Sequence, residues 1–303
     1  MDIIDTHAHL WLTQDTVVGG QPIRQLTGNR SRSEFFGEER QMLPPFMVDG
    51  RNSAEVFLSN MDYAQVAAAV ITQEFIDGLQ NDYLETVGRQ YSNRFFVFGM
   101  ADWRQAGFYD EAATLLRRGF RGLKVPAARL PKEFLHDGDF RRVLALMAAE
   151  DAILGIELHD GDCQTGMMEE IISDFPTLRI VIGHFGMVTR TGWLSQIRLA
   201  RHPNVYIDSG GITWLFNSEF YPFPSAIRAI QEAADCAGWE KLMWGSDYPR
   251  TITAITYRMS YDFVTKSAEL TDSQKQMFLG DNARRLFGFQ ELVSLPYIKN
   301  MSE

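Results

Sequence analysis

Two histidines separated by one residue end the first apolar run of the chain. His7 and His9 lie within MDIIDTHAHLW, shortly after Met1. Successive residues of a strand point to opposite faces, so Asp5 shares a face with both histidines. The other face then carries Ile4, Thr6, Ala8 and Leu10. An HxH pair at the end of a strand can offer two imidazole nitrogens to one cation. Two unrelated interior histidines, each satisfied by a hydrogen bond, are the alternative that the motif leaves open.

Three more candidate ligands fall at the ends of apolar runs. His159 lies in GIELHD, His184 in IVIGHFG and Asp247 in MWGSDYP. Imidazole nitrogens and a carboxylate form a donor set that suits Zn²⁺ or another divalent transition metal. The sequence therefore predicts a metal site, provided that the fold brings these strand ends together.

Eight short apolar runs bounded by turn signals are typical of buried parallel strands. They cover residues 3–10, 66–72, 95–102, 120–125, 152–159, 179–186, 204–211 and 242–249. Segments with helical periodicity lie between most of them, including 55–65, 82–91, 109–120, 139–151, 165–175 and 226–238. This alternation predicts an α/β fold, a (β/α)8 TIM barrel with its active site at the C-terminal ends of the strands. An open doubly wound sheet is the alternative, but the first turn lacks a GxGxxG fingerprint.

One connection is longer than a barrel needs. Residues 12–52 are rich in Gly, Pro and charge, and we expect them to form a lid insertion after the first strand, over the barrel mouth. Residues 290–303 are predicted to be a C-terminal extension. The whole chain, 1–303, is interpreted as a single domain.

Composition limits the classes of partner. The formal charge is −10 at pH 7, which opposes binding to nucleic acid or to an anionic membrane surface. No apolar run has the roughly 18 residues of a membrane span. Cys163 and Cys236 lack the spacing of a disulfide framework or a thiolate metal site. We expect a cytoplasmic enzyme with a small-molecule substrate, and a homodimer on general frequency alone.

Four motifs in order, DTHAHLW, IVIGHFG, MWGSDYPR and GDNARRLFGF, resemble the amidohydrolase superfamily. The resemblance covers nearly the whole chain and lies within the amidohydrolase-related branch of TIM-barrel hydrolases, lactonases and decarboxylases. It implies one divalent metal, Zn²⁺ or else Mn²⁺. The residues implied as its ligands are His7, His9, His159 and Asp247. It also implies that His184 orients water or polarises substrate. Members with two metals use a carbamylated lysine of strand four, which Lys124 matches.

Several residues are candidates for substrate contact. Arg250 could clamp a carboxylate, Trp214 could line a pocket, and Asp160 follows the fifth strand. Lys124 could bind an anionic substrate or pair with a carboxylate, and Glu157 is the inward carboxylate that could pair with it or support a ligand.

The favoured activity is hydrolysis of a small lactone, ester or amide by metal-activated water. Asp247 would act as base and then acid, and His184 would assist. Decarboxylation or hydration of a small unsaturated or aromatic acid is the second hypothesis, and a non-catalytic metal-binding barrel is the third. Some lactonases of this branch work without metal, so a complete ligand set does not establish occupancy.

Overall fold

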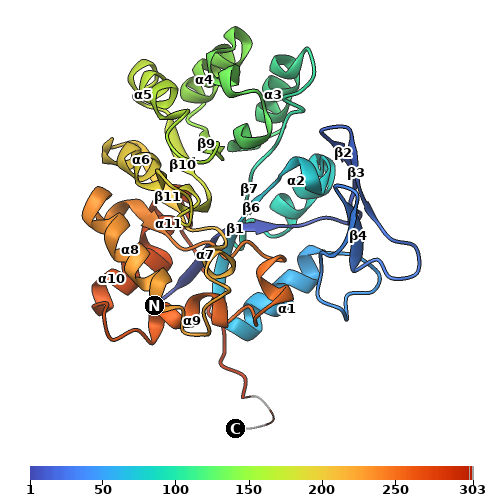
Figure 1. Cartoon of the computed structure of the whole chain (residues 1–303), viewed down its shortest axis with the longest axis vertical. Coiled ribbons are helices and arrows are strands. Elements are labelled where there is room, and N and C mark those ends of the chain that lie inside the picture. The colour runs from blue at the N-terminus through green and yellow to red at the C-terminus, as the bar shows by residue number, and fades with distance from the viewer. Residues whose placement is uncertain (300, 302–303) are drawn as a thin grey trace.

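Parallel strands of two sheets form the centre of the molecule (Figure 1). The structure, a computed structural model, describes residues 1–299 and Met301. One sheet has the order β1-β6-β7 and the other the order β12-β11-β10-β9-β8. The strands are β1 Ile3–His9, β6 Val66–Thr72, β7 Phe95–Val97, β8 Gly122–Val125, β9 Ile153–Ile156, β10 Arg179–Ile182, β11 Val205–Asp208 and β12 Leu242–Met243. All eight predicted strands are present, and their order is that of a (β/α)8 barrel.

Single bridges link the two sheets at both places where they meet. Gly99 and Leu123 join the β7 side to β8, and Ala8 and Tyr248 join β1 to the segment after β12. The backbone N–H of His9 donates to the Tyr248 carbonyl at 2.8 Å. The C-terminal ends of β1 and β12 are therefore held side by side, and these ends carry three of the predicted ligands.

Helices surround the strands and bury their outward faces. They are α1 Ala54–Ala64, α2 Asn81–Gln90, α3 Phe108–Arg117, α4 Gly138–Ala149, α5 Thr165–Asp174, α6 Trp193–Arg198, α7 Ile212–Leu215, α8 Pro224–Ala237, α9 Met259–Thr265, α10 Asp272–Gln276 and α11 Asn282–Phe287. The larger apolar cluster lies between the strands and these helices. A smaller one, the inner cluster, fills the space enclosed by the strands, with Val70, Phe96, Ile153 and Val181 among its members. Residues of α11 close the inner cluster at the N-terminal ends of the strands. The polar side chains of the candidate site lie at the opposite, C-terminal ends.

Strict alternation along β1 is a prediction that the structure corrects. Ile4 packs in the inner cluster, although alternation had placed it on the outer face. Asp5 instead accepts hydrogen bonds from the Tyr257 hydroxyl at 2.7 Å and the Ser246 backbone N–H at 2.8 Å. The pairing of β1 with β6 shifts register between Ile3 and Ile4 and again between Asp5 and Ala8. Such irregularities reverse the side-chain alternation locally, and only His7 and His9 keep their predicted inward direction.

The segment between β1 and α1 is an ordered antiparallel sheet instead of a loop. Its strands are β2 Asp15–Val18, β3 Gln21–Gln25, β4 Arg32–Phe35 and β5 Glu38–Gln41, paired in chain order. The sheet stands beside the barrel strands (Figure 1). The β4–β5 hairpin turns through Phe36 and Gly37, both with positive φ, and brings Phe36 to the mouth of the barrel.

The chain after Phe289 has no helix or strand among residues 290–299 and Met301. It passes α1, where the Gln65 side chain donates to the Pro296 carbonyl at 3.3 Å. No helix within the described residues has the length and apolar character needed to cross a membrane.

Candidate active site

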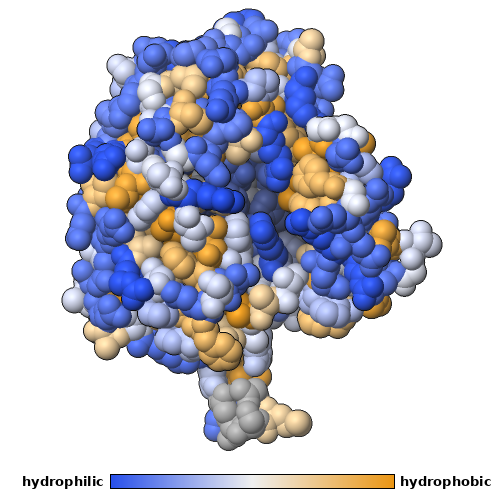
Figure 2. Space-filling view, viewed as in Figure 1, coloured by the Kyte–Doolittle hydropathy of each residue, from blue (hydrophilic) through white to orange (hydrophobic). Residues whose placement is uncertain are grey.

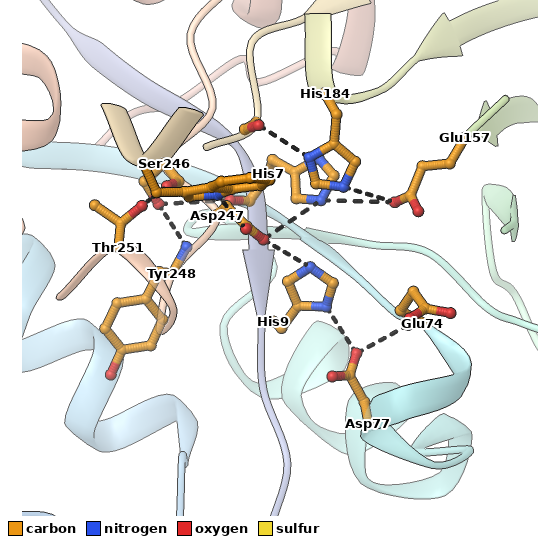
Figure 3. A network of polar contacts seen from close by, with 12 residues as sticks. His7, His9, Glu74, Asp77, Glu157, His184, Ser246, Asp247, Tyr248 and Thr251 are labelled. Carbon is orange, nitrogen blue, oxygen red and sulfur yellow. Dashed lines mark hydrogen bonds and ion pairs between the residues drawn. The ribbon is translucent and has the colours of Figure 1, made fainter. Parts of the chain in front are cut away.

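Five side chains converge at the C-terminal ends of the strands (Figure 3). His7 and His9 come from β1, Glu157 follows β9, His184 follows β10, and Asp247 follows β12. Their donor atoms form two overlapping groups, each within 4.8 Å. One group is His7, His9 and Asp247, and the other is His7, Glu157 and His184. Of the residues predicted to act as ligands or catalysts, the structure brings together His7, His9, His184 and Asp247.

Each histidine is held through Nδ1, which turns Nε2 toward the centre. His7 Nδ1 lies 3.0 Å from Asp208 Oδ1, and His9 Nδ1 lies 2.7 Å from Asp77 Oδ2. His184 Nδ1 lies 2.9 Å from the Gly210 carbonyl, which can only accept, so Nδ1 carries the proton. An oxygen acceptor on one ring nitrogen is the usual way in which proteins fix the tautomer of a metal-binding histidine.

The inward atoms lie close to carboxylate oxygens. His9 Nε2 lies 3.3 Å from Asp247 Oδ1, and His7 Nε2 lies 3.9 Å from the same oxygen. His7 Nε2 is buried and makes no hydrogen bond within the described part of the chain. A buried polar atom without a partner is costly, and a cation beside this nitrogen would satisfy it. The donor set and this unpartnered nitrogen therefore fit a divalent metal ion.

Local electrostatics favour the ligand forms of His7 and Asp247. Burial lowers the pKa of His7, although Asp208 acts in the opposite direction, so the imidazole is neutral. Burial alone would raise the pKa of Asp247, but the neighbouring histidines, His9 first, lower it. Asp247 is therefore ionised. A neutral imidazole and a carboxylate are the protonation states that bind a cation.

The other side of the site is an ion-paired cluster. Burial alone would raise the pKa of Glu157, but Lys124 and His184 hold it well below its usual value. Burial lowers the pKa of His184, but Glu157 Oε1, 3.2 Å from Nε2, outweighs it and raises the pKa to about 9. His184 is thus a hydrogen-bond donor at neutral pH.

Two glycines let the backbone come close to His7. A Cβ on Gly210 would lie 2.7 Å from His7 Nδ1, and one on Gly245 would lie 2.6 Å from His7 Cβ. Neither glycine has a positive φ, so close approach, not backbone conformation, requires them. His184 and Asp247 themselves both have φ 57°, a conformation that non-glycine residues adopt mainly where the surroundings enforce it.

His159, which the sequence predicted as a ligand, lies outside both groups of converging donor atoms in the described part of the chain. Its Nε2 lies 2.9 Å from the Leu130 carbonyl, and its side chain lines a separate hollow with Lys132, Asp160 and Cys163. β9 ends at Ile156, so strand alternation extends inward only as far as Glu157. Glu157 therefore occupies the fifth-strand place in the site that the sequence had assigned to His159.

Lys124 adopts one of its predicted alternatives. Its Nζ lies 2.7 Å from Glu157 Oε1, and both residues are buried. The amine is therefore engaged in an ion pair with Glu157.

The remaining predicted contacts divide between the mouth and the outside. Asp160 is exposed, lies 3.4 Å from Arg190 Nε, and does not line the mouth. Arg250 lines the mouth and stacks on Trp214, with Cζ 3.7 Å from the ring centroid. Trp214 donates its indole N–H to Asp247 Oδ2 at 2.7 Å.

The mouth is a cavity of about 490 Å³ above the five converging side chains. Its walls combine apolar and cationic groups, namely Trp11, Phe35, Phe36, Met42, Ile76, Arg40, Arg129 and Arg250. Figure 2 shows this face hollowed at its centre, with mainly hydrophilic residues around the opening. A larger hollow of about 600 Å³ lies at the other ends of β7 and β8 and contains none of the converging residues.

Sequence reasoning missed several residues of the site, among them Asp208, Asp77 and Arg129. Asp208 ends β11, so the strand-end rule that found His184 could have found it. Asp77 lies in a short helical turn after β6, and Arg129 in another after β8, where no periodic pattern points at the site. Arg129 Nε lies 2.6 Å from Glu74 Oε2, and its guanidinium faces the Phe36 ring at 5.6 Å.

Comparisons with known proteins relate the chain to enzymes. A protein of Burkholderia ambifaria described as L-fucono-1,5-lactonase is 28% identical over 240 residues, which is 74% of this chain and 78% of that protein. An amidohydrolase from Burkholderia multivorans, solved with bound zinc, has a TM-score of 0.69 at 18% identity, covering 95% of this chain and 99% of that one.

Two further solved structures share the fold. A probable 2-pyrone-4,6-dicarboxylic acid hydrolase from Acinetobacter baumannii, with citric acid bound, has a TM-score of 0.68 at 19% identity, covering 95% of this chain and 100% of that one. A 5-carboxyvanillate decarboxylase from Novosphingobium aromaticivorans, complexed with manganese, has a TM-score of 0.59 at 17% identity, covering 80% and 82%. The model of the family described as Amidohydrolase matches residues 4–289, and the chain belongs to that family.

Proposed function

We propose that this protein is a metal-dependent hydrolase that opens a small lactone, with one Zn²⁺ held by His7, His9 and Asp247. The unpartnered Nε2 of His7 beside the Asp247 carboxylate is the observation that carries the proposal. The zinc-bound relative in fold and the lactonase relative in sequence support it. One ion is favoured over two, because Lys124 is committed to Glu157.

A divalent cation bound at this site would polarise a substrate carbonyl and acidify a water molecule. Asp247 would accept the proton of the attacking water and then return it to the leaving oxygen. His184, kept protonated by its pairing with Glu157, would place a positive charge near the carbonyl oxygen as negative charge develops there. The apolar wall around Phe35 and Trp11 would exclude other water.

The substrate proposed is a small ring compound that carries a carboxylate or several hydroxyl groups. Arg40, Arg129 and Arg250 line one cavity, and guanidinium groups recognise carboxylates through paired hydrogen bonds. A cavity of about 490 Å³ accepts a ligand of this size. The lactonase relative and the dicarboxylic acid hydrolase that shares the fold support this class.

The test combines metal analysis with a lactone screen. Protein purified without chelator is analysed for metals, and sugar lactones and carboxylated pyrones are then assayed by acid release. About one zinc per chain and hydrolysis lost in Asp247→Asn are the expected results. Asp160→Asn, which changes an exposed aspartate outside the mouth, is the matched control. Full activity of the Asp247→Asn enzyme would refute the proposed role of this residue.

Decarboxylation is the second candidate, favoured by the shared fold with a manganese-bound decarboxylase. The same chain would then move a proton at carbon instead of oxygen. Release of CO₂ from carboxylated aromatic acids, without any lactone opening, would assign the protein to this chemistry.

A further inference from the structure

The indole ring of Trp214 connects the rim of the mouth to Asp247. Its Nε1–H donates to Asp247 Oδ2 at 2.7 Å, and Arg250 Cζ lies 3.7 Å from its ring centroid. Arg250 is exposed, whereas Asp247 is buried. One ring therefore contacts both a cation of the rim and the carboxylate at the base of the cavity.

The two oxygens of Asp247 have different partners. Oδ1 lies 3.3 Å from His9 Nε2 and 3.9 Å from His7 Nε2, while Oδ2 accepts from the indole. The Asp247 backbone is fixed as well, since its N–H donates to the His7 carbonyl at 2.8 Å. With the backbone fixed, the remaining freedom is rotation about the Cα–Cβ and Cβ–Cγ bonds of Asp247. The bond to the indole restrains that rotation and keeps Oδ1 facing the histidines.

The local fold is built around this position of the indole. Trp214 lies in α7, a short helix that begins directly after Gly211, and Gly211 has φ 73°. A Cβ on Gly211 would lie 1.7 Å from Trp214 Nε1, so any larger residue would displace the ring. The Trp214 ring also meets His184 edge-on, with centroids 6.2 Å apart.

We propose that Trp214 is a positioning residue that orients the Asp247 carboxylate, and that Arg250 holds the indole in place by stacking. This inference rests on the proposed function, because that function gives Asp247 its role as ligand and proton carrier. An outer residue that orients a metal ligand typically affects metal affinity about 10–100-fold.

Metal binding tests the inference without any substrate. Zn²⁺ alone is titrated into metal-free protein in competition with a chromophoric chelator. Trp214→Phe is expected to bind Zn²⁺ about tenfold more weakly, and Trp214→His, which keeps a ring N–H, is expected to recover part of the loss. Arg250→Gln is expected to weaken binding in the same direction. Trp239→Phe, in the helical turn just before β12 and so at the other end of that strand from the site, is the control and should match the wild type. Unchanged affinity in Trp214→Phe would overturn the proposal.

A spectroscopic experiment tests the hydrogen bond itself. The chain has six tryptophans, so its indole N–H signals form a small set in an ¹H–¹⁵N spectrum. The signal missing in Trp214→Phe identifies the ring. That signal is expected to shift strongly in Asp247→Asn and again when Zn²⁺ is added to the wild type. A signal that stays in place in Asp247→Asn would also overturn the proposal. Circular dichroism and melting temperature confirm that each variant is folded.

The two proposals fail in different ways. Normal zinc binding and the expected Trp214 responses, with no lactone hydrolysed, would refute the hydrolase function and leave the positioning role standing. Lactone hydrolysis, together with equal zinc affinity in Trp214→Phe and the wild type, would support the hydrolase function and refute the positioning role of Trp214.

Discussion

Acceptors on Nδ1 determine what the three inward histidines can do. Asp208, Asp77 and the Gly210 carbonyl each hold one ring, so every Nε2 is directed at the same small volume. The ligands alone do not define the site, because an imidazole that could rotate freely would lose much of its affinity for a metal. The acceptors should therefore matter nearly as much as the histidines.

Replacing Asp208 by Asn tests this at the His7 ring. The amide keeps the size of the side chain but loses the charge that steadies His7 Nδ1–H. We expect zinc affinity to fall about 10-fold, with a smaller loss of stability. Isothermal titration of metal-free protein with Zn²⁺ measures the change. Asp174→Asn, an exposed change on α5, serves as the control, and equal affinities for all three proteins would contradict the prediction.

The buried pair of Lys124 and Glu157 should be strongly coupled. Lys124→Met removes one partner and leaves the buried Glu157 carboxylate with His184 as its remaining cationic partner. We expect a loss of about 3–5 kcal/mol in the free energy of unfolding. The double variant Lys124→Met, Glu157→Gln removes both charges and should lose less than the sum of the single changes. Urea unfolding in the presence of chelator measures all four proteins, and strictly additive losses would rule out the coupling.

The sequence could predict those residues of the site that lie at the ends of recognisable strands. His7, His9, His184 and Asp247 end predicted strands, and the structure brings all four together. His159 also ends a predicted run, but β9 stops at Ile156 and the chain turns the imidazole away. Where a strand ends depends on hydrogen bonds to its neighbours, which a single sequence does not display. Asp77 and Arg129 come from three-residue helical turns, which are too short to show a repeating pattern of apolar residues.

At the scale of elements, the antiparallel sheet of β2–β5 supplies one wall of the mouth. Phe35, Phe36 and Arg40 of the β4–β5 hairpin line the cavity, beside groups that belong to the barrel. The sequence indicated an insertion over the mouth but not its strands, because the segment is polar and its strands are only four or five residues long. Register within such strands is set by hairpin turns and not by a hydrophobic face.

Phe36→Asn tests the contribution of the hairpin. Phe36 has φ 53°, a conformation that Asn adopts more easily, so the fold should be unaffected or slightly stabilised. The substitution removes the ring that covers the Arg129 guanidinium. We expect KM for the substrate to rise several-fold while kcat changes little. Steady-state kinetics decides the question, and a fall in kcat at constant KM would show that the hairpin acts on the chemistry instead.

Considered as a whole, the molecule places its apolar core and its polar site at different levels of the same barrel. The inner cluster around Phe96 and Val181 fills the lower level, and the converging side chains fill the upper one. Alternating strand and helix patterns predicted this architecture well, since burial against both layers imposes the pattern. The single-domain interpretation, the homodimer and the cytoplasmic location stay predictions; light scattering on the purified protein would test the second.

Stability at alkaline pH should depend on buried phenols. Burial raises the pKa of Tyr248, Tyr257 and Tyr261 above the usual value of about 10, and that of Tyr261 to about 12. The folded state therefore holds these protons more tightly than the unfolded chain. Their contribution is complete below about pH 10 and is lost as the pH rises through the folded-state value.

The comparison of wild type with Tyr261→Phe isolates one phenol. The variant loses the hydrogen bond to the Ala64 carbonyl and should be about 1 kcal/mol less stable at neutral pH. Above about pH 10 this difference should shrink, because only the wild type has a Tyr261 proton to lose. Urea unfolding between about pH 8 and about pH 11 provides the data. A difference that stays constant across this range would show that Tyr261 titrates normally in the fold.

The two-way backbone bridge between Trp11 and Asn52 has a consequence for how this protein could diversify. Each residue donates its N–H to the carbonyl of the other at 3.0 Å, so the chain leaves the barrel and returns to it at adjacent points. The residues between them therefore form an insertion whose two ends are joined by this pair of hydrogen bonds. Replacement of this insertion by another segment would alter one wall of the mouth and leave the end of β1 that carries His7 and His9, and the remaining strands, intact. Substrate range and catalytic chemistry can thus evolve, or be engineered, on separate stretches of one chain.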